Sequence, residues 1–240
     1  MVFAIIAGLY WYLLVFGAAA QANGLPVPSF VPMVPGWPPS DADLVPVIED
    51  SVHFFYISDA IATISGQAAQ SPPQLRLAFF NFAEAWVFSF LPLLLADKKR
   101  LPLPVVLGTW IGALGLTNAF LAPYLMVRQV FSNKEDDDND KSIQSKFLNL
   151  PVGGIATLVV GYAAFQTALT TVVSPNEWTD FFMLVTTDRT YLAFAIDLVL
   201  FSVFQSFLVD EWKSQQQDES GEDSSYGVPF VGLMAWMFRS

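Results

Sequence analysis

The chain alternates between long apolar runs and short polar or proline-rich segments. An α-helix rises about 1.5 Å per residue, so about 20 apolar residues are needed to cross a hydrocarbon core of about 30 Å. Runs that approach or reach this length lie at residues 2–20, 76–96, 103–127, 152–173 and 190–209. We therefore predict an all-α fold, a polytopic transmembrane helix bundle of about five spans.

Polar residues mark several boundaries between these runs. Residues 97–100 separate the second run from the third, and residues 210–213 follow the fifth. Consecutive spans alternate in direction across a membrane. Five spans therefore place Lys99 on one face, with Arg128 and Lys213 on the opposite face.

The segments around the runs differ in composition. Residues 21–51 are rich in proline, which predicts an extended connector that contacts a partner chain. Residues 52–65 are apolar but too short to cross, which predicts an interfacial or re-entrant helix. The acidic loop 132–149 and the polar residues 214–225 are expected to be solvated, and the apolar residues 226–238 are expected to pack at the interface. The predicted organisation is a first span (1–20), a connector with the interfacial helix (21–75), a four-span bundle (76–209) and a C-terminal segment (210–240).

The composition supports the membrane interpretation. Hydrophobic residues are 54% of the 240 residues and charged residues only 14%, where about 25% is usual for soluble domains. The 22 acids against 11 bases give a net charge of −11, which excludes a nucleic-acid binder. The absence of cysteine excludes disulfides and thiolate metal sites.

Two carboxylates interrupt the apolar runs. Glu84 and Asp197 lie near the middle of the second and fifth runs, where an ionised carboxylate costs a few kcal/mol or more. Counting about 1.5 Å per residue from one face places Glu84 nearly level with Asn118, and Asp197 nearly level with Gln166. We predict that each of these pairs forms a hydrogen bond between neighbouring helices.

Three roles are open for these polar residues. They are structural bonds between helices with protonated acids, axial ligands to a chlorophyll magnesium, or, for the two carboxyls, general acids toward an apolar substrate. His53, the single histidine, is either an interfacial side chain or one pigment ligand. The candidate cofactors are chlorophyll, carotenoid and bound lipid, and the candidate cofactor-binding residues are His53, Glu84, Asn118, Gln166 and Asp197.

A short pattern occurs twice along the chain. An acid followed by x3-Phe-Ser-x5-Leu-x-Asp begins at Glu84 and again at Asp197, a shift of 197 − 84 = 113 residues. Five spans make these two helices run in opposite directions, as in an inverted repeat. Both helices are rich in Phe and Leu, and chance similarity is the simpler interpretation.

Three stretches carry a resemblance to a protein family. They are TNAFLAPY at 117–124, FAIDLVLFSVFQSFLVDEWK at 194–213 and VPFVGL at 228–233. They resemble a poorly characterised family of multi-span plastid membrane proteins of algae and plants with cyanobacterial relatives, over about residues 76–238. The resemblance implies a thylakoid or plastid-envelope location and association with a photosystem. It implies no catalytic residue.

These observations lead to an expected function. Aromatic residues are 15% of the chain, with 22 Phe, which suits packing against pigments and other helices. No H-E-x-x-H, G-x-S-x-G or glycine-rich phosphate motif is present. We expect a non-catalytic integral membrane subunit that docks, links or stabilises a larger plastid complex, a photosystem with its light-harvesting antenna, with lipids and other membrane subunits as partners. The alternatives are a membrane enzyme acting on a lipid-soluble substrate such as a carotenoid, or a small transporter.

Overall fold

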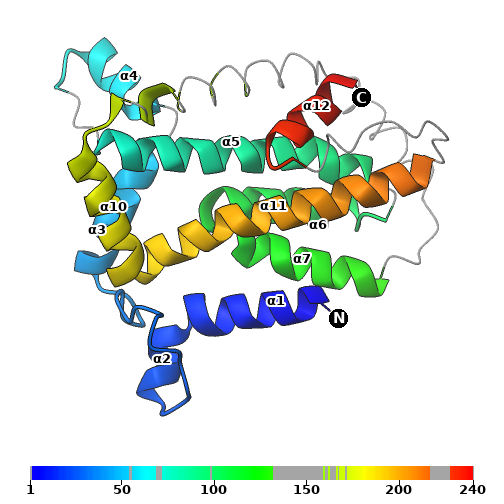
Figure 1. Ribbon diagram of the computed structural model, residues 1–240, viewed down its shortest axis with the longest axis horizontal. Helices are drawn as coiled ribbons and strands as arrows, with labels where there is room; N and C mark the ends of the chain where they lie inside the picture. The colour runs from blue at the N-terminus through cyan, green and yellow to red at the C-terminus, as the bar shows by residue number, and fades with distance from the viewer. Residues whose placement is uncertain are drawn as a thin grey trace. The chain divides into compact units, whose positions relative to one another are not determined.

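The computed structural model is helical wherever it describes regular structure, with no strand in the described residues (Figure 1). The described residues are 2–53, 56–68, 72–97, 99–131, 159, 162, 166, 168–170, 172–216 and 228–239. Their α-helices are α1 (Val2–Tyr10), α2 (Gly17–Ala22), α3 (Asp41–Val52), α4 (Ile57–Ser65), α5 (Gln74–Ala96), α6 (Leu103–Leu116), α7 (Asn118–Phe131), α10 (Pro175–Thr187), α11 (Arg189–Gln216) and α12 (Val231–Arg239), and a π-helix, η1 (Trp11–Val15), follows α1.

The chain divides into two compact units. Unit 1 comprises Met1–Ala7, Ala85–Gly161 and Asp197–Ser240, and unit 2 comprises Gly8–Glu84 and Tyr162–Ile196. The long helices α5 and α11 each contribute their first part to unit 2 and the remainder to unit 1.

Two helices in the described part of the chain are long and apolar enough to cross a membrane. They are α5, with 23 residues, and the 25-residue stretch of α11 that ends at Lys213. Most of the apolar stretch of α5 is buried within the protein, whereas most of that of α11 is not. Two of the five predicted spans are thus present as helices of sufficient length and apolarity.

These two helices run in the same direction. In unit 2, the side chain of Arg76 donates a hydrogen bond to the Tyr191 hydroxyl at 3.3 Å. One turn further along both helices, the rings of Phe80 and Phe194 stack with centroids 4.9 Å apart. The contacts advance together along the two helices, so α5 and α11 are parallel. The five-span topology, which makes them antiparallel, is wrong on this point.

The predicted third span, residues 103–127, is broken into a helical hairpin. The break is at Thr117, whose φ of 40° and ψ of −116° are not helical. Helices α6 and α7 pack side by side (Figure 1), and the Phe120 ring lies against Gly112. Each helix has 14 residues and is therefore about 21 Å long, shorter than a hydrocarbon core.

The remaining predicted spans have different outcomes. Residues 2–20 form three successive short helices, α1, η1 and α2, of which Val2–Val15 is apolar but short. Residues 152–173 lie largely outside the described part of the chain, as do the acidic loop 132–149 and the polar residues 217–225.

The proline-rich connector is only partly extended. Residues 24–40 are not helical, but α3 follows them with Pro46 inside it. The reason is a local cap, because the backbone N–H and the hydroxyl of Ser40 both donate to the Asp43 carboxylate, at 3.0 and 2.6 Å. The extended part bonds to another segment of the same chain. The Arg189 backbone N–H donates to the Val34 carbonyl at 2.6 Å, and the Arg189 guanidinium donates to the Pro35 carbonyl at 2.6 Å.

The predicted helix over residues 52–65 is shorter than expected. It begins at Ile57, after Tyr56, whose φ of 55° is left-handed. It ends at Ser65, with Gly66 in the left-handed conformation as its C-cap. The structure thus places only Val52 of the predicted segment in α3, and residues 57–65 form α4.

Candidate functional site

The tip of the α6–α7 hairpin is fastened to α11 by a buried carboxylate in unit 1. The Thr117 hydroxyl donates to one oxygen of Asp197, and the Asn118 amide donates to the other at 2.8 Å and to the Asp197 carbonyl at 3.2 Å. Asp197 is 3% exposed and Asn118 is fully buried. Non-helical backbone within a membrane is tolerated only where protein or a water-filled cavity surrounds it. The buried contact with Asp197 therefore supplies the surrounding protein that the non-helical backbone at Thr117 needs.

Both predicted hydrogen-bonded pairs are wrong. Asn118 bonds Asp197 and not Glu84, and neither amide atom of Gln166 forms a hydrogen bond in the described part of the chain. The depth count assumed one continuous helix through residues 103–127. Because the chain reverses at Thr117, Asn118 lies at the tip of a hairpin and not partway along a span.

Glu84 occupies a different environment from Asp197. It lies at the end of the unit 2 part of α5 and is partly buried. It makes no hydrogen bond or ion pair with any residue that the structure describes. Its carboxyl oxygens are therefore still available to a ligand.

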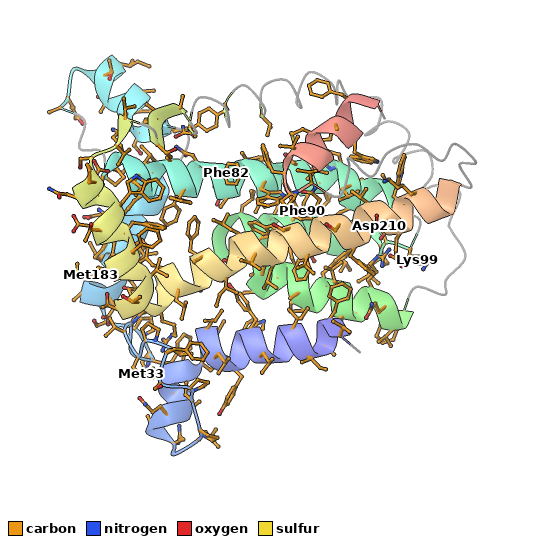
Figure 2. All side chains as sticks on the ribbon, in the orientation of Figure 1. Met33, Phe82, Phe90, Lys99, Met183 and Asp210 are labelled. Carbon is orange, nitrogen blue, oxygen red and sulfur yellow. The ribbon has the colours of Figure 1, made fainter. Side chains whose placement is uncertain are left out.

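A buried ionic cluster joins three helices at their C-terminal ends in unit 1. Arg128, 1% exposed, donates through Nε and Nη2 to the two oxygens of Asp97, with 2.7 Å for the Nη2 bond. Nη2 also lies 2.5 Å from Glu211, whose other oxygen accepts from Lys99 Nζ at 3.1 Å. Figure 2 labels Lys99 and Asp210, the residue that precedes Glu211 in α11. Burial by itself lowers the pKa of Arg128, but the neighbouring carboxylates of Asp97 and Glu211 raise it by more. The net result is a raised pKa, so the guanidinium stays charged.

This cluster corrects the predicted distribution of charges between faces. Asp97 directly follows α5, Arg128 lies in the last turn of α7, and Glu211 lies near the end of α11. Side chains in direct contact cannot lie on opposite faces of a membrane, so the placement of Lys99 and Arg128 on different faces is wrong. Sequence reasoning counted these charges only as boundary markers. The sequence feature that could have indicated this cluster is that Asp97 and Arg128 each directly follow an apolar run.

Gln205 links α5, α11 and the segment that leads into α12. Its side-chain oxygen accepts from the Trp86 indole N–H at 3.0 Å and from the Phe230 backbone N–H at 2.8 Å. Its amide nitrogen donates to the Val228 carbonyl at 2.9 Å. One buried amide therefore positions the C-terminal helix against the core of unit 1, a role that sequence reasoning did not assign.

His53 has a local partner. Its Nδ1 lies 3.2 Å from the Asp59 carboxylate, and both side chains are partly exposed. This contact agrees with an interfacial side chain near water. It leaves Nε2 as the only ring nitrogen able to bind a pigment.

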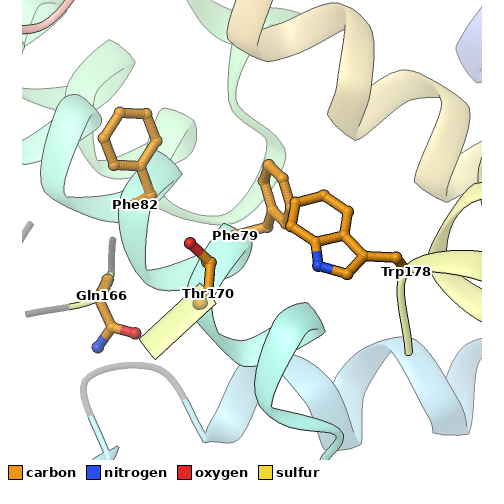
Figure 3. Close-up of a pocket in the computed structure, with 6 residues that line it drawn as sticks. Phe79, Phe82, Gln166, Thr170 and Trp178 are labelled. Carbon is orange, nitrogen blue, oxygen red and sulfur yellow. The ribbon is translucent and has the colours of Figure 1, made fainter. Parts of the chain in front are cut away.

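A cavity of about 190 Å³ lies in unit 2 between α5, α10 and the side chains of Gln166 and Thr170 (Figure 3). Its walls are mostly apolar, and the Phe79 ring that lines it stacks on Phe181 with centroids 4.6 Å apart and planes 6° from parallel. Trp178 meets Phe79 edge to face, with centroids 6.0 Å apart. The lining residues are Ala78, Phe79, Phe82, Gln166, Thr170 and Trp178.

Gln166 is the polar group of interest in this cavity. It is 1% exposed, and both its amide atoms are buried without a hydrogen bond in the described part of the chain. The nearby phenol of Tyr56 has a pKa that burial raises and that its interaction with the Gln166 amide lowers to a smaller degree.

The described residues contain no group of three or more His, Asp or Glu side chains that could hold a metal ion. Comparison with family models, curated proteins and solved structures gives no match. Over the residues that it describes, the structure is thus all-α and contains two helices long and apolar enough to span a membrane.

Proposed function

We propose that this protein is a non-catalytic integral membrane subunit that docks to, links or stabilises a larger complex in the plastid thylakoid membrane, namely a photosystem with its light-harvesting antenna. The membrane setting is supported by α5 and α11. The plastid and photosystem assignments are supported by the sequence resemblance of residues 76–238.

One observation carries the docking role: helices that already bury one apolar face expose another. On α11, Val199 and Val203 are 64% and 46% exposed, although Phe201 between them is completely buried. On α1, Ile5 and Leu9 are each 53% exposed. A helix that is apolar all round lies in a protein core or in a membrane. These outer faces therefore suit lipid or the helices of a membrane partner.

Bound pigment is part of the proposal. A chlorophyll magnesium accepts oxygen ligands, and the Glu84 carboxyl has its oxygens available. Asp197 and Asn118 suit this role less well, because the Thr117 hydroxyl and the Asn118 amide already donate to the two Asp197 oxygens. An axial oxygen from Glu84 would fix the position of one pigment.

Comigration tests the proposal. The tagged chain, expressed in thylakoids, is expected to migrate with a photosystem on native gels and to retain pigment after purification. Val199→Gln together with Val203→Gln should weaken comigration without preventing membrane insertion, because it makes the outer face of α11 polar. Thr187→Gln, at an exposed position outside α11, is the matched control. Migration as a free small protein in mild detergent would contradict the docking role.

A small transporter is the second candidate, favoured by the hairpin tip at Asp197. Transporters place broken helices and a buried polar group near the middle of the membrane. Asp197→Asn keeps the size of the side chain and removes its titratable proton. The docking role predicts normal assembly and normal photosynthetic electron flow in this variant. Normal assembly with lost function would favour the transporter, or an enzyme that uses the carboxyl as an acid.

A further inference from the structure

The two helices that precede α5 in unit 2 turn their apolar sides away from the protein. Successive residues of a helix are about 100° apart around its axis. On α3, four exposed apolar side chains therefore share one side, and they are Leu44, Val45, Ile48 and Val52. The described side chains of α3 that are partly buried, Asp43 and Val47, lie on the other side.

Helix α4 repeats this arrangement. Its apolar side consists of Ile57, Ile61 and Ile64, which are 46%, 61% and 87% exposed. Its partly buried residues lie on the other side and are Ser58, Asp59 and Ala62. A surface helix of a globular protein normally turns its apolar stripe toward the core. The reversed orientation of α3 and α4 therefore suits an apolar phase that lies against their outer sides.

Hydrogen bonds hold these two helices at the first end of a membrane-length helix. The hydroxyl of Tyr56, directly before α4, donates to Oε1 of Gln74, the first residue of α5, at 3.4 Å. The Ser58 hydroxyl donates to the carbonyl of Val52, the last residue of α3, at 2.5 Å. The apolar stretch of α5 begins at Gln74. The start of α4 and the end of α3 therefore lie at the level where α5 would enter a membrane.

We propose that α3 and α4 form a platform, residues 41–65, that lies in the surface of the bilayer with its apolar sides toward the acyl chains. An amphipathic helix in this position buries its apolar side about 5–10 Å into the boundary between headgroups and acyl chains. Lipid is the occupant that the position at the end of α5 provides. The inference rests on the membrane setting of the proposed function and adds to it a second, peripheral contact with lipid.

The charge of the platform selects the lipid. Residues 41–65 contain five carboxylates and one histidine but no lysine or arginine. Interfacial helices that bind anionic lipids carry lysine and arginine on their polar side, whereas the polar residues of this platform are acidic or uncharged. The platform therefore prefers zwitterionic or uncharged headgroups, and anionic headgroups repel it.

Spin labels on α4 test the contact with lipid. Single cysteines replace Ile61 and Thr63, two exposed positions on opposite sides of α4, in the full-length chain, which has no native cysteine. Each labelled chain is reconstituted into phosphatidylcholine nanodiscs, and collisions of the label with oxygen and with a water-soluble nickel chelate are measured. The ratio of oxygen to nickel collisions should be several-fold higher for Ile61→Cys than for Thr63→Cys, because oxygen concentrates among acyl chains.

Two further results decide this test. Ile64→Cys, at the most exposed of the three isoleucines, should match Ile61→Cys and guards against a local effect of one label. A ratio at both isoleucine positions as low as that of Thr63→Cys would mean that the apolar side of α4 faces water in a bilayer. That result would overturn the proposal in favour of a protein partner for this side.

Anionic lipid tests the headgroup preference. Adding phosphatidylglycerol to the nanodiscs should lower the ratio of Ile61→Cys, and added salt should restore it, because salt screens repulsion between exposed charges. An unchanged or higher ratio with phosphatidylglycerol would overturn the preference for uncharged headgroups.

A label on α11 separates this inference from the proposed function. Val203→Cys lies on the exposed apolar side of α11 and should show a high ratio in the same nanodiscs. Low ratios at both Val203 and Ile61 would contradict the membrane setting and the platform together. A high ratio at Val203 with a low ratio at Ile61 would overturn the platform alone.

Discussion

Single side chains determine where the apolar helices end and how they meet. Arg128 shows this most clearly, because a guanidinium buried to 1% exposure is balanced by two carboxylates from other segments. A buried charge is tolerated when opposite charges lie next to it. Without the Arg128 guanidinium, Asp97 and Glu211 would be two neighbouring negative charges with no buried positive charge between them.

Removing the guanidinium should therefore destabilise the protein strongly. We expect Arg128→Leu to lower the free energy of unfolding by about 3–5 kcal/mol, because Asp97 and Glu211 lose their buried partner. Unfolding in detergent micelles by SDS, followed by circular dichroism, measures this. Lys99→Ala, which removes a half-exposed partner of Glu211, should cost about 0–1 kcal/mol. Equal losses in the two variants would contradict a buried cluster.

A second residue-scale prediction concerns pH. The hydrogen bonds from Ser40 lower the pKa of Asp43. A lowered folded-state pKa means that the cap's stabilisation is present above the unfolded value of about 3.9 and is lost as the pH falls through the folded value. In Ser40→Ala, the Asp43 pKa measured by NMR should rise toward the unfolded value. An unchanged pKa would show that Ser40 does not cap α3.

At the scale of elements, the α6–α7 hairpin depends on a glycine that packs against the Phe120 ring. A Cβ placed on Gly112 would lie 2.6 Å from the Phe120 ring, whereas one on Gly108 or Gly115 would meet nothing within 4 Å. The three glycines share one helix and differ only in this contact.

We expect Gly112→Ala to destabilise the hairpin by about 1–3 kcal/mol, since the added methyl must displace Phe120. Gly108→Ala and Gly115→Ala should be neutral or stabilise by up to about 1 kcal/mol through helix propensity. The same unfolding assay compares them. In the Phe120→Ala background, the penalty of Gly112→Ala should largely vanish, and its persistence would place the clash elsewhere.

At the scale of the whole molecule, the parallel direction of α5 and α11 constrains the topology. Two helices that both cross a membrane in the same direction must be separated by an odd number of crossings. The α6–α7 hairpin returns to the level of the Arg128 cluster, because its 14-residue arms match the separation of Asp197 and Glu211, which are 211 − 197 = 14 positions apart on α11, about 21 Å. The hairpin therefore contributes no crossing of its own between α5 and α11.

Site-specific labelling tests this topology on a chain without native cysteine. Single cysteines replacing Lys99, Gln129 and Asp210 should react with an impermeant maleimide from one side of the membrane, because all three positions lie near the ionic cluster. A cysteine replacing Thr187, just before α11, should react from the other side. Labelling of Thr187→Cys and Asp210→Cys from the same side would show that α11 does not cross.

The sequence alone established the helical class, the two long apolar helices and the buried polar residues that matter in the fold. Apolar run length and period suffice for these, because a membrane-length helix is a local property of the chain. Asn118, Gln166 and Asp197 were identified because polar groups in apolar runs require partners. The cap at Ser40 and Asp43 is equally local, although the proline content of the connector obscured it.

Only the tertiary structure decided the partners and the directions of the helices. The backbone of a single residue, Thr117, turns the apolar run 103–127 into a hairpin. The hydropathy of this run is the same for a continuous spanning helix and for a hairpin, so it cannot distinguish them. Because of that reversal, Asn118 bonds Asp197 in place of Glu84 and Arg128 lies against Asp97. It also changes the number of crossings between α5 and α11, which are parallel. The cavity beside Gln166 likewise depends on residues about 80 to 100 positions apart in sequence, because which helices become neighbours is set by packing that no local pattern contains.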